Sequence, residues 1–277
     1  MLVKDRIDQS IADTNINAEQ IMRFEALAKE WWKPDGKFRV MHGFNDARSS
    51  YIQTFIANKF NRDLTEEKPL RHISVLDVGC GGGLASEPLA SLGAMVVGVD
   101  ATSRNIEIAR CHAHRTGVEI DYRHGTAHSA VAAEELFDVV LNLEVIEHVD
   151  DPRKLIADCT AHLKPGGVIF IATLNRSFRA LMLAIIGGEY ILRWLPVGTH
   201  DWRRFLKPLE VEAMLASEEL MIGETVGIGM NPLSRKWRIT ANTSVNYMLI
   251  AQKPANIKAL REPGSLYSRH GLRVIYA

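Results

Sequence analysis

The chain has 277 residues, 47% of them hydrophobic, which is enough to form one α/β domain of ordinary size with short appendages. Its 33 basic and 33 acidic side chains cancel, so the overall charge argues against nucleic acid as a partner. The three cysteines, Cys80, Cys111 and Cys159, are odd in number and widely spaced, which argues against a disulfide framework or a zinc site. Charges interrupt every apolar stretch of residues 1–20, so we expect neither a signal peptide nor a membrane span. We therefore expect a cytoplasmic protein.

The N-terminal part is predicted to be a helical appendage or lid. Apolar residues recur at helical spacing over residues 17–30, which indicates an amphipathic helix. A second helix is predicted at 47–59, and the polar stretch 61–68 is typical of a linker. The expected organisation of the whole chain is an N-terminal appendage, 1–70, a main domain, 71–253, and a weakly ordered tail, 254–277.

In the main domain, short apolar runs rich in β-branched residues alternate with helical patterns. Apolar strands separated by helices indicate a parallel sheet that is covered on both faces and wound by right-handed crossovers. The sequence therefore predicts an α/β, doubly wound, Rossmann-like fold. The predicted strands are 74–79, 95–100, 120–125, 137–143 and 166–174, and the predicted helices are 84–92, 103–116 and 152–163.

The alternation changes after this point. A long insertion, 175–207, precedes a predicted helix at 208–216. Two further predicted strands, 221–228 and 247–252, are joined by a loop long enough for a hairpin-like return at the sheet edge. These two strands complete a mostly parallel sheet of seven strands.

A glycine-rich turn follows the first predicted strand, in the run VLDVGCGGGL at 75–84. Gly79 and Gly81 let the backbone turn tightly and approach a ligand at the carboxyl end of the strand, where sheets of this kind bind nucleotides. Leu84 stands where a dinucleotide fingerprint has a third small residue, and the carboxylate of Asp77 would repel a pyrophosphate. S-adenosylmethionine carries an ammonium and a sulfonium and no phosphate, so the charge of Asp77 favours it.

The ends of the next strands supply further candidate cofactor contacts. Asp100 ends the second predicted strand, where it can accept hydrogen bonds from both ribose hydroxyls. Ala127 follows the third strand and is expected to border the adenine, and Leu143 ends the fourth strand and is expected to pack against the cofactor. The alternative, a purely structural glycine turn, leaves the strand, turn, helix and acid in this order unexplained.

These residues carry a family resemblance. LDVGCGGGLASEPLA, LNLEVIEHVDDP and LKPGGVIFIATLNR resemble segments of class I methyltransferases. Two further segments narrow the match to one family, because they resemble the ubiquinone-biosynthesis O-methyltransferases: WWKPDGKFRVMHGFNDARSSYI and GGEYILRWLPVGTHDWRRFLKP. The resemblance covers residues 20–253. It implies that S-adenosylmethionine is the cofactor and that Arg48, Gly79, Asp100 and Leu143 contact it, with Arg48 at the methionine carboxylate.

The resemblance also implies a substrate class. Enzymes of this family methylate phenol or catechol hydroxyls of polyprenylated benzene rings at two steps of ubiquinone biosynthesis. The resemblance also makes other ubiquinone-biosynthesis enzymes candidate partners of this chain. The length of the prenyl chain and the preferred hydroxyl are not encoded in any motif of the sequence.

Two carboxylates and an imidazole follow the fourth predicted strand, in LEVIEHV. If Glu144 begins a helical turn, then Glu147 and His148 lie on the same face, and the three side chains form a candidate site for Mg²⁺ or Zn²⁺. Such a cation would lower the pKa of a catechol hydroxyl. Without metal, His148 or Glu144 is a candidate general base. The alternative is that Glu147 and His148 only brace the junction of strand and helix.

The insertion 175–207 combines apolar residues and tryptophans with six cations. Its apolar stretches are too short to span a bilayer, but segments of this composition lie in the interface of an anionic membrane, where a polyprenyl substrate dissolves. We therefore expect a peripheral association with the inner face of the membrane. The alternative is a helical lid that stays packed on the active site.

Two other classes of function share part of this pattern. A nicotinamide-dependent oxidoreductase shares the fold and Asp100 but not the acid at position 77, and a non-catalytic membrane-docking scaffold has no need of the glycine turn. Scattered histidines, including His112, are assigned no role. Trp31 and Trp32 are expected to pin the N-terminal helix, with lining of the acceptor pocket as the alternative.

Overall fold

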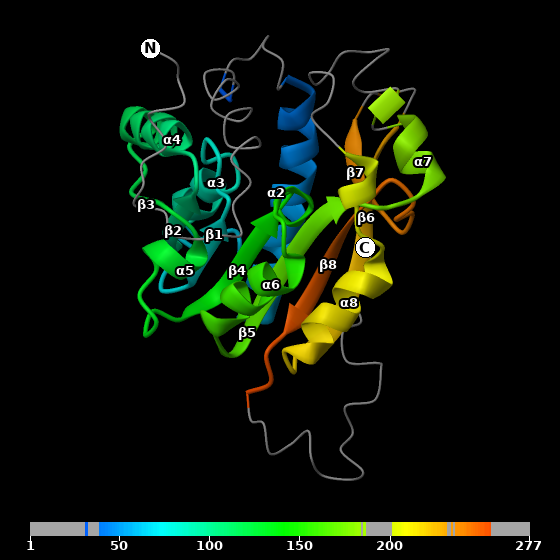
Figure 1. Cartoon of the computed structure of the whole chain (residues 1–277). Helices are drawn as coiled ribbons and strands as arrows, with labels where there is room; N and C mark the ends of the chain where they lie inside the picture. The colour runs from blue at the N-terminus through cyan, green and yellow to red at the C-terminus, as the bar shows by residue number, and fades with distance from the viewer. Residues whose placement is uncertain are drawn as a thin grey trace, which may run out of the picture.

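A computed structural model describes residues 31–32, 39–183, 185–186, 201–231, 234 and 236–255. The predicted helix 17–30 lies outside these residues. Within them the chain forms an eight-stranded sheet with helices on both faces (Figure 1). The strands are β1 (Ser74–Val78), β2 (Met95–Asp100), β3 (Asp121–His124), β4 (Phe137–Leu143), β5 (Leu163–Leu174), β6 (Met221–Met230), β7 (Trp237–Thr240) and β8 (Asn246–Gln252).

The strand order confirms the predicted doubly wound, mostly parallel sheet. It runs β3-β2-β1-β4-β5-β8-β6-β7. The first five strands along the chain pair in parallel, and β8 pairs antiparallel with both β5 and β6. The return at the sheet edge is thus present, and β6 points the same way as β1 to β5. β7 pairs antiparallel with β6 and adds an eighth strand that the sequence did not predict.

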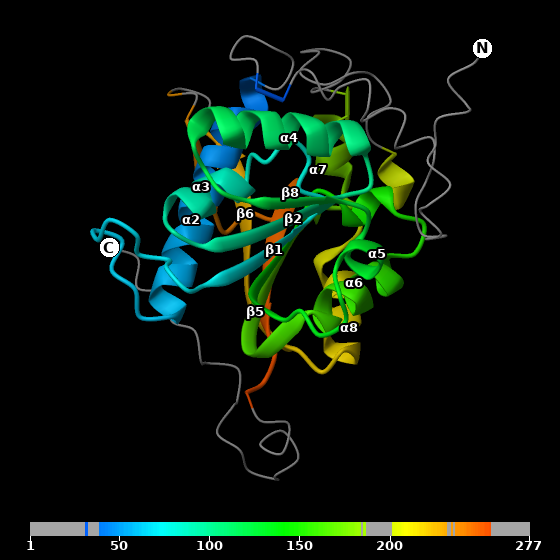
Figure 2. The same cartoon turned by 90° about the vertical axis from the view of Figure 1, so that its left-hand side faces the viewer.

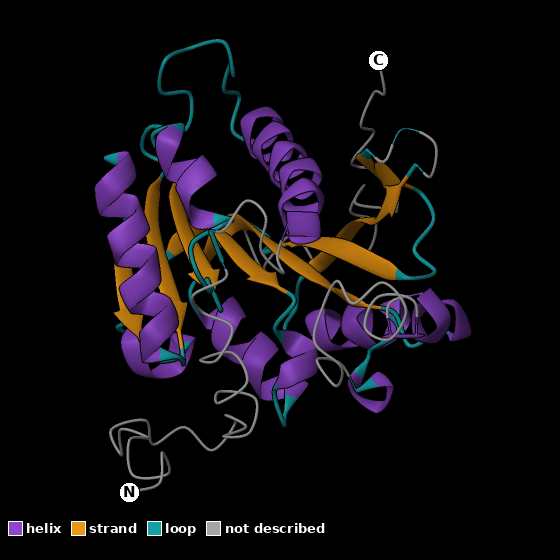
Figure 3. Ribbon diagram, turned by 90° about the horizontal axis from the view of Figure 1, so that it is seen from above, coloured by secondary structure: helices purple, strands orange, loops and turns teal. Residues whose placement is uncertain are grey.

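Helices cover the two faces of the sheet (Figure 2, Figure 3). One face carries α2 (Arg39–Lys59), α3 (Ser86–Ser91) and α4 (Ser103–Thr116). The other carries α5 (Ala127–Ala130), α6 (Pro152–Ala161) and α8 (Pro208–Ser217). The described parts of the insertion include α7 (Phe178–Ala180) and the short 3-10 helix η5 (Trp202–Arg204). No helix among the described residues is long and apolar enough to cross a membrane.

Helix α2 is longer than predicted, since it begins at Arg39 and not at residue 47. Ile52, Phe55 and Ile56 lie on one face of it and pack into the core between the helix and the sheet. Arg48 precedes Ile52 by one helical turn, so the packing of α2 brings its guanidinium to the end of β4.

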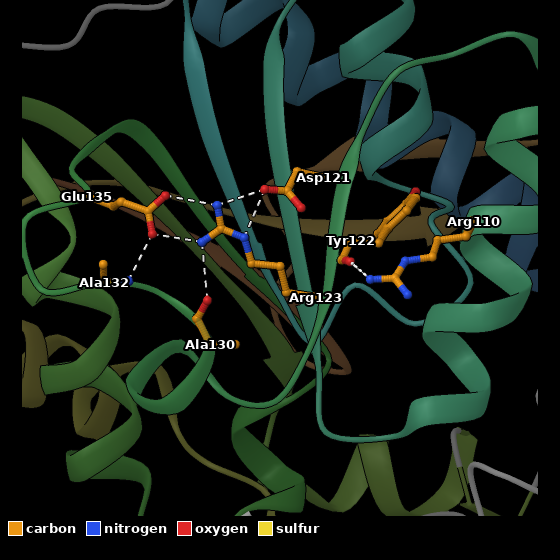
Figure 4. Close-up of polar contacts among 7 residues, drawn as sticks. All are labelled: Arg110, Asp121, Tyr122, Arg123, Ala130, Ala132 and Glu135. Atoms are coloured by element: carbon orange, nitrogen blue, oxygen red, sulfur yellow. Dashed lines mark hydrogen bonds and ion pairs between the residues drawn. The ribbon is translucent and has the colours of Figure 1, made fainter.

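Arg123 ties the edge strand β3 to the loop that leads into β4 (Figure 4). Its guanidinium donates to both carboxylate oxygens of Glu135, at 2.7 and 2.9 Å, to Asp121 at 2.7 Å and to the carbonyl oxygen of Ala130 at 3.2 Å. Glu135 also accepts from the backbone N–H of Ala132 at 2.8 Å. This network fixes the segment that contains α5.

We expect the variant Arg123→Gln to melt about 1–3 °C below the wild type near neutral pH, because it removes a network of partly exposed ion pairs. The hydrogen bonds from Arg123 lower the pKa of Glu135 to about 2. The pKa of Glu135 in the folded state thus lies below its value of about 4.3 in the unfolded state. The contribution of Glu135 to the free energy of unfolding is therefore fully present above the unfolded-state pKa, and it is lost as the pH falls through the folded-state pKa. Circular dichroism melting curves at several pH values measure the difference. Equal melting temperatures near neutral pH would contradict it.

Candidate active site

The glycine turn lies at the carboxyl end of β1, between β1 and α3. Gly79, Gly81 and Gly83 have φ values of 76°, 54° and 89°, in the left-handed region that favours glycine. A Cβ added at Gly79 would lie 2.3 Å from Cγ2 of Val145, so this position also lacks room for any side chain. The turn therefore packs directly against the segment that follows β4.

Asp77 lies in β1 just before the turn and is 1% exposed. Its carboxylate accepts a hydrogen bond from the hydroxyl of Ser86 at 2.6 Å. Burial raises the pKa of Asp77 to about 6, although the bond from Ser86 and the charge of Arg48 oppose the shift. The carboxylate is thus ionised at neutral pH and takes up a proton in mildly acidic solution.

Asp100, at the end of β2, is tied to the glycine turn. One carboxylate oxygen accepts from the N–H of Gly81 at 2.9 Å, and the other accepts from the N–H of Thr102 at 2.8 Å and from Nδ2 of Asn105 at 3.2 Å. Burial raises the pKa of Asp100, and these hydrogen bonds oppose the shift. These hydrogen bonds hold the carboxylate at the end of β2, beside the glycine turn.

Two other predicted cofactor residues lie at the same edge of the sheet. The backbone N–H of Gly125 donates to the carbonyl of Asp100 at 2.9 Å, which brings the start of α5, including the buried Ala127, beside the end of β2. Leu143 is the last residue of β4 and is buried. The structure therefore gathers these residues with Asp77 and Asp100 at the carboxyl ends of β1, β2 and β4.

A buried cluster of charges lies at the end of β4. Nη1 of Arg48 lies 3.2 Å from Oε1 of Glu144, and its Nη2 donates to Oδ1 of Asn45. Oε2 of Glu147 accepts from the hydroxyl of Thr173 at 2.8 Å. Glu147 is 2% exposed, and burial together with the charge of Glu144 raises its pKa well above the usual range. Burial thus favours the protonated form of Glu147 more than it would for an exposed glutamate.

The predicted helical turn from Glu144 is not formed. Glu144 has a φ of 57°, in the left-handed region, and the 3-10 helix η3 covers Ile146–His148. Glu144 therefore turns towards Arg48 on α2, and it does not share a helix face with Glu147 and His148. Among the residues that the structure describes, no three His, Cys, Asp or Glu side chains stand together as possible metal ligands.

Three residues near this site were not predicted. Asn142 in β4 is fully buried, and neither atom of its amide has a hydrogen-bond partner. Nε2 of His42, on α2, is likewise buried without a partner. Thr173 in β5 bonds Glu147. Two sequence signals could have found Asn142 and His42. One is an Asn inside an otherwise apolar strand, and the other is the spacing of three that links His42, Asn45 and Arg48.

Comparison with known proteins identifies the family. A family model described as a methyltransferase domain matches residues 76–171. The chain is 50% identical over 241 residues to the ubiquinone biosynthesis O-methyltransferase of Chelativorans sp. (strain BNC1), a match that covers 87% of this chain and 95% of the relative. It is 48% identical over 249 residues to the protein of the same name from Parvibaculum lavamentivorans, covering 90% and 98%.

The chain belongs to the ubiquinone biosynthesis O-methyltransferase family. This confirms the predicted S-adenosylmethionine-dependent O-methyltransferase and its cofactor. The relatives of this O-methyltransferase do not support the nicotinamide-dependent oxidoreductase or the scaffold.

Solved structures agree on the fold of the O-methyltransferase. Magnesium protoporphyrin IX methyltransferase from Synechocystis PCC 6803, with bound SAH, gives a TM-score of 0.58 at 17% identity and covers 84% of this chain and 94% of its own. A SAM-dependent methyltransferase from Thermotoga maritima, a possible histamine N-methyltransferase, gives 0.58 at 20% identity and covers 85% and 99%. At these identities the likeness shows the fold alone.

We expect cofactor binding to weaken in mildly acidic solution. With a pKa of about 6, Asp77 loses its charge as the pH falls through that value, and with it the attraction for the cationic cofactor. If only the ionised form binds, the Kd for S-adenosylmethionine at about pH 5.5 is about four times that at pH 7.5. Calorimetric titration measures this. The variant Asp77→Asn should bind more weakly with little pH dependence, and equal slopes in both proteins would contradict the assignment.

Proposed function

We propose that the enzyme methylates a phenol or catechol hydroxyl on a polyprenylated precursor of ubiquinone. The names of its relatives support this substrate class. The observation that carries the proposal is the buried cluster of Arg48, Glu144 and Glu147 beside the glycine turn. A neutral phenol is a poor nucleophile, and this cluster supplies acid–base groups next to the cofactor pocket.

The cofactor is proposed to lie along the carboxyl ends of β1, β2 and β4. Asp100, held beside the glycine turn, is the candidate for the ribose hydroxyls, and the ionised Asp77 suits the positively charged end of the molecule. Arg48 is the candidate for the methionine carboxylate. The residues proposed to hold the cofactor are Arg48, Asp77, Gly79, Gly81, Asp100, Ala127 and Leu143.

Methyl transfer breaks the sulfur–methyl bond and forms an oxygen–methyl bond, while the hydroxyl proton passes to a base. We propose Glu144 or His148 as that base. Glu147 is a poor candidate, because its side chain is buried and its carboxylate is bonded to Thr173. Oε1 of Glu144 lies 3.2 Å from Nη1 of Arg48, and this ion pair holds the carboxylate at the end of β4. Alignment of oxygen, methyl and sulfur supplies much of the remaining acceleration.

From the sequence alone we also propose a divalent cation, Mg²⁺ or Zn²⁺, with Glu144, Glu147 and His148 as its ligands. In the described geometry these side chains do not form a ligand set, because the carboxylate of Glu144 is engaged by Arg48. A cation bound there would supply Lewis-acid activation of a catechol hydroxyl.

A methyl-transfer assay on a soluble catechol tests the reaction. We expect activity in the wild type and a fall of kcat of about 100-fold or more in Glu144→Gln or in His148→Gln, at saturating cofactor, whichever is the base. Glu119→Gln makes the same change at an exposed site and should be as active as the wild type. A wild type that binds the cofactor but methylates neither phenols nor catechols would overturn the proposed substrate class.

The same assay with a chelator tests the cation. Loss of activity that Mg²⁺ or Zn²⁺ restores in the wild type supports the proposal. Full activity after chelation would remove the cation and leave the general base.

We propose that the insertion 175–207 meets an anionic membrane at its inner face, where it would also lie close to other enzymes of the pathway. Its described ends are anchored by the buried Ala180 and Phe205, while apolar side chains nearby face outwards. Phe178 is 73% and Leu183 57% exposed, and the exposed set also includes Met182, Ile186, Trp202 and Leu209. A set of exposed apolar side chains favours a docking surface over a lid that is wholly packed on the protein.

The division of the chain into an appendage, a main domain and a tail, with boundaries near residues 70 and 253, remains a proposal.

Liposome flotation tests the membrane proposal. Arg179 and Arg203 are exposed beside the apolar residues, whereas Arg204 is paired with Asp150 at 2.8 Å. We expect the wild type to float with anionic but not with zwitterionic vesicles, and Arg179→Glu with Arg203→Glu to weaken flotation. The control Arg115→Glu reverses one exposed arginine on α4 and should float like the wild type, and it is compared with each single reversal, Arg179→Glu and Arg203→Glu. Equal partition into both lipids would contradict an electrostatic contact.

A further inference from the structure

Trp31 lies against the glycine turn. A Cβ added at Gly81 would lie 2.8 Å from Cζ2 of Trp31, and one added at Gly82 would lie 2.6 Å from its Cγ. The indole thus packs directly on the backbone of the turn, where any residue other than glycine would place a Cβ. Its Nε1 donates to Oδ1 of Asn105 at 3.0 Å. Trp31 therefore contacts both the turn after β1 and the start of α4.

Trp32 makes a second set of contacts with the same region. Its Nε1 donates to the carbonyl oxygen of Gly82 at 2.8 Å. Its ring stacks on that of His112, with centroids 3.5 Å apart and an interplanar angle of 2°. Nδ1 of His112 lies 2.7 Å from Oε1 of the buried Glu87. Trp32 is thereby fixed to α3 and α4 as well as to the turn.

These contacts lead to a cofactor residue. Asn105 accepts from Trp31 through Oδ1 and donates to Asp100 through Nδ2 at 3.2 Å. The bond from the indole fixes which way the amide of Asn105 faces, and hence that its N–H groups point to the carboxylate of Asp100. Packing alone would be satisfied by any large apolar ring, but it would not orient the amide.

We propose that Trp31 and Trp32 are positioning residues for the cofactor. Trp31 orients Asp100 through Asn105, and Trp32 holds the Gly82 carbonyl, so that the ribose acceptor and the glycine turn keep the geometry that binds the nucleoside. The proposal rests on S-adenosylmethionine as the cofactor. It gives the two tryptophans a part in cofactor affinity and none in the transfer step.

Calorimetry with S-adenosylhomocysteine tests the proposal in the full-length protein. Trp31→Phe keeps an aromatic ring and removes the indole N–H. Loss of one hydrogen bond that orients a charged acceptor is expected to raise the Kd about ten-fold, while kcat at saturating S-adenosylmethionine stays within about two-fold. Trp32→Phe should have the same kind of effect through Gly82. Trp202→Phe makes the matched change in η5, where the indole Nε1 donates to the carbonyl oxygen of Ser177 at 3.1 Å, and should leave the Kd unchanged.

A double-mutant cycle identifies the route. Trp31→Phe and Asn105→Ala act on one chain of hydrogen bonds, so their combined effect on Kd should be smaller than the product of the single effects. An unchanged Kd in Trp31→Phe would show that the ring only packs, and a lower Kd would show that Trp31 stands in the place of the cofactor. Either result overturns the proposal. A wild type that fails to bind S-adenosylhomocysteine would instead sink the cofactor assignment.

Discussion

The guanidinium of Arg48 lies buried among the carboxylates of Asp77, Glu144 and Glu147, and the geometry of the candidate site depends on this interaction. Burial disfavours every charge in the cluster, and it lowers the pKa of Arg48 itself. Arg48 and Glu144 form an ion pair, while burial and the charge of Glu144 raise the pKa of Glu147. A buried pair of this kind adds little stability by itself, but removing one partner leaves an uncompensated charge.

The same charges suit the cofactor. Asp77 and Asp100 lie near the carboxyl ends of two neighbouring strands beside the glycine turn, so this region offers carboxylates where a phosphorylated dinucleotide would need N–H groups and cations. S-adenosylmethionine brings positive charge on sulfur and nitrogen and a single carboxylate for which Arg48 is available. Packing also shapes the glycine turn, because Val145 and Trp31 occupy the spaces that side chains at Gly79 and Gly81 would fill.

Much of the fold could be predicted because local pattern and tertiary role agree. Helix α4 has the predicted bounds, residues 103–116, since its end at Gly117 is a left-handed glycine cap. β2 and β4 were also predicted to the residue, because buried parallel strands are apolar nearly throughout. β7 escaped prediction, since its four residues are partly exposed and owe their conformation to pairing with β6.

The site was harder to predict than the fold. Positions at strand ends, such as Asp100 and Leu143, follow from topology. The contact between Glu144 and Arg48 does not, because Arg48 lies 96 residues earlier in the chain and meets Glu144 only after α2 packs. Residues such as Trp31 and Asn105 gain their meaning from a contact between distant segments, which spacing along the sequence does not reveal.

Thermal melting of Arg48 variants tests the central claim most directly. Removing one partner of a buried ion pair costs about 3–5 kcal/mol, so Arg48→Met should melt about 6–20 °C below the wild type. Adding Glu144→Gln removes the uncompensated charge and should recover most of that loss. An Arg48→Met variant that melts at the wild-type temperature would contradict the view that this guanidinium holds the site together.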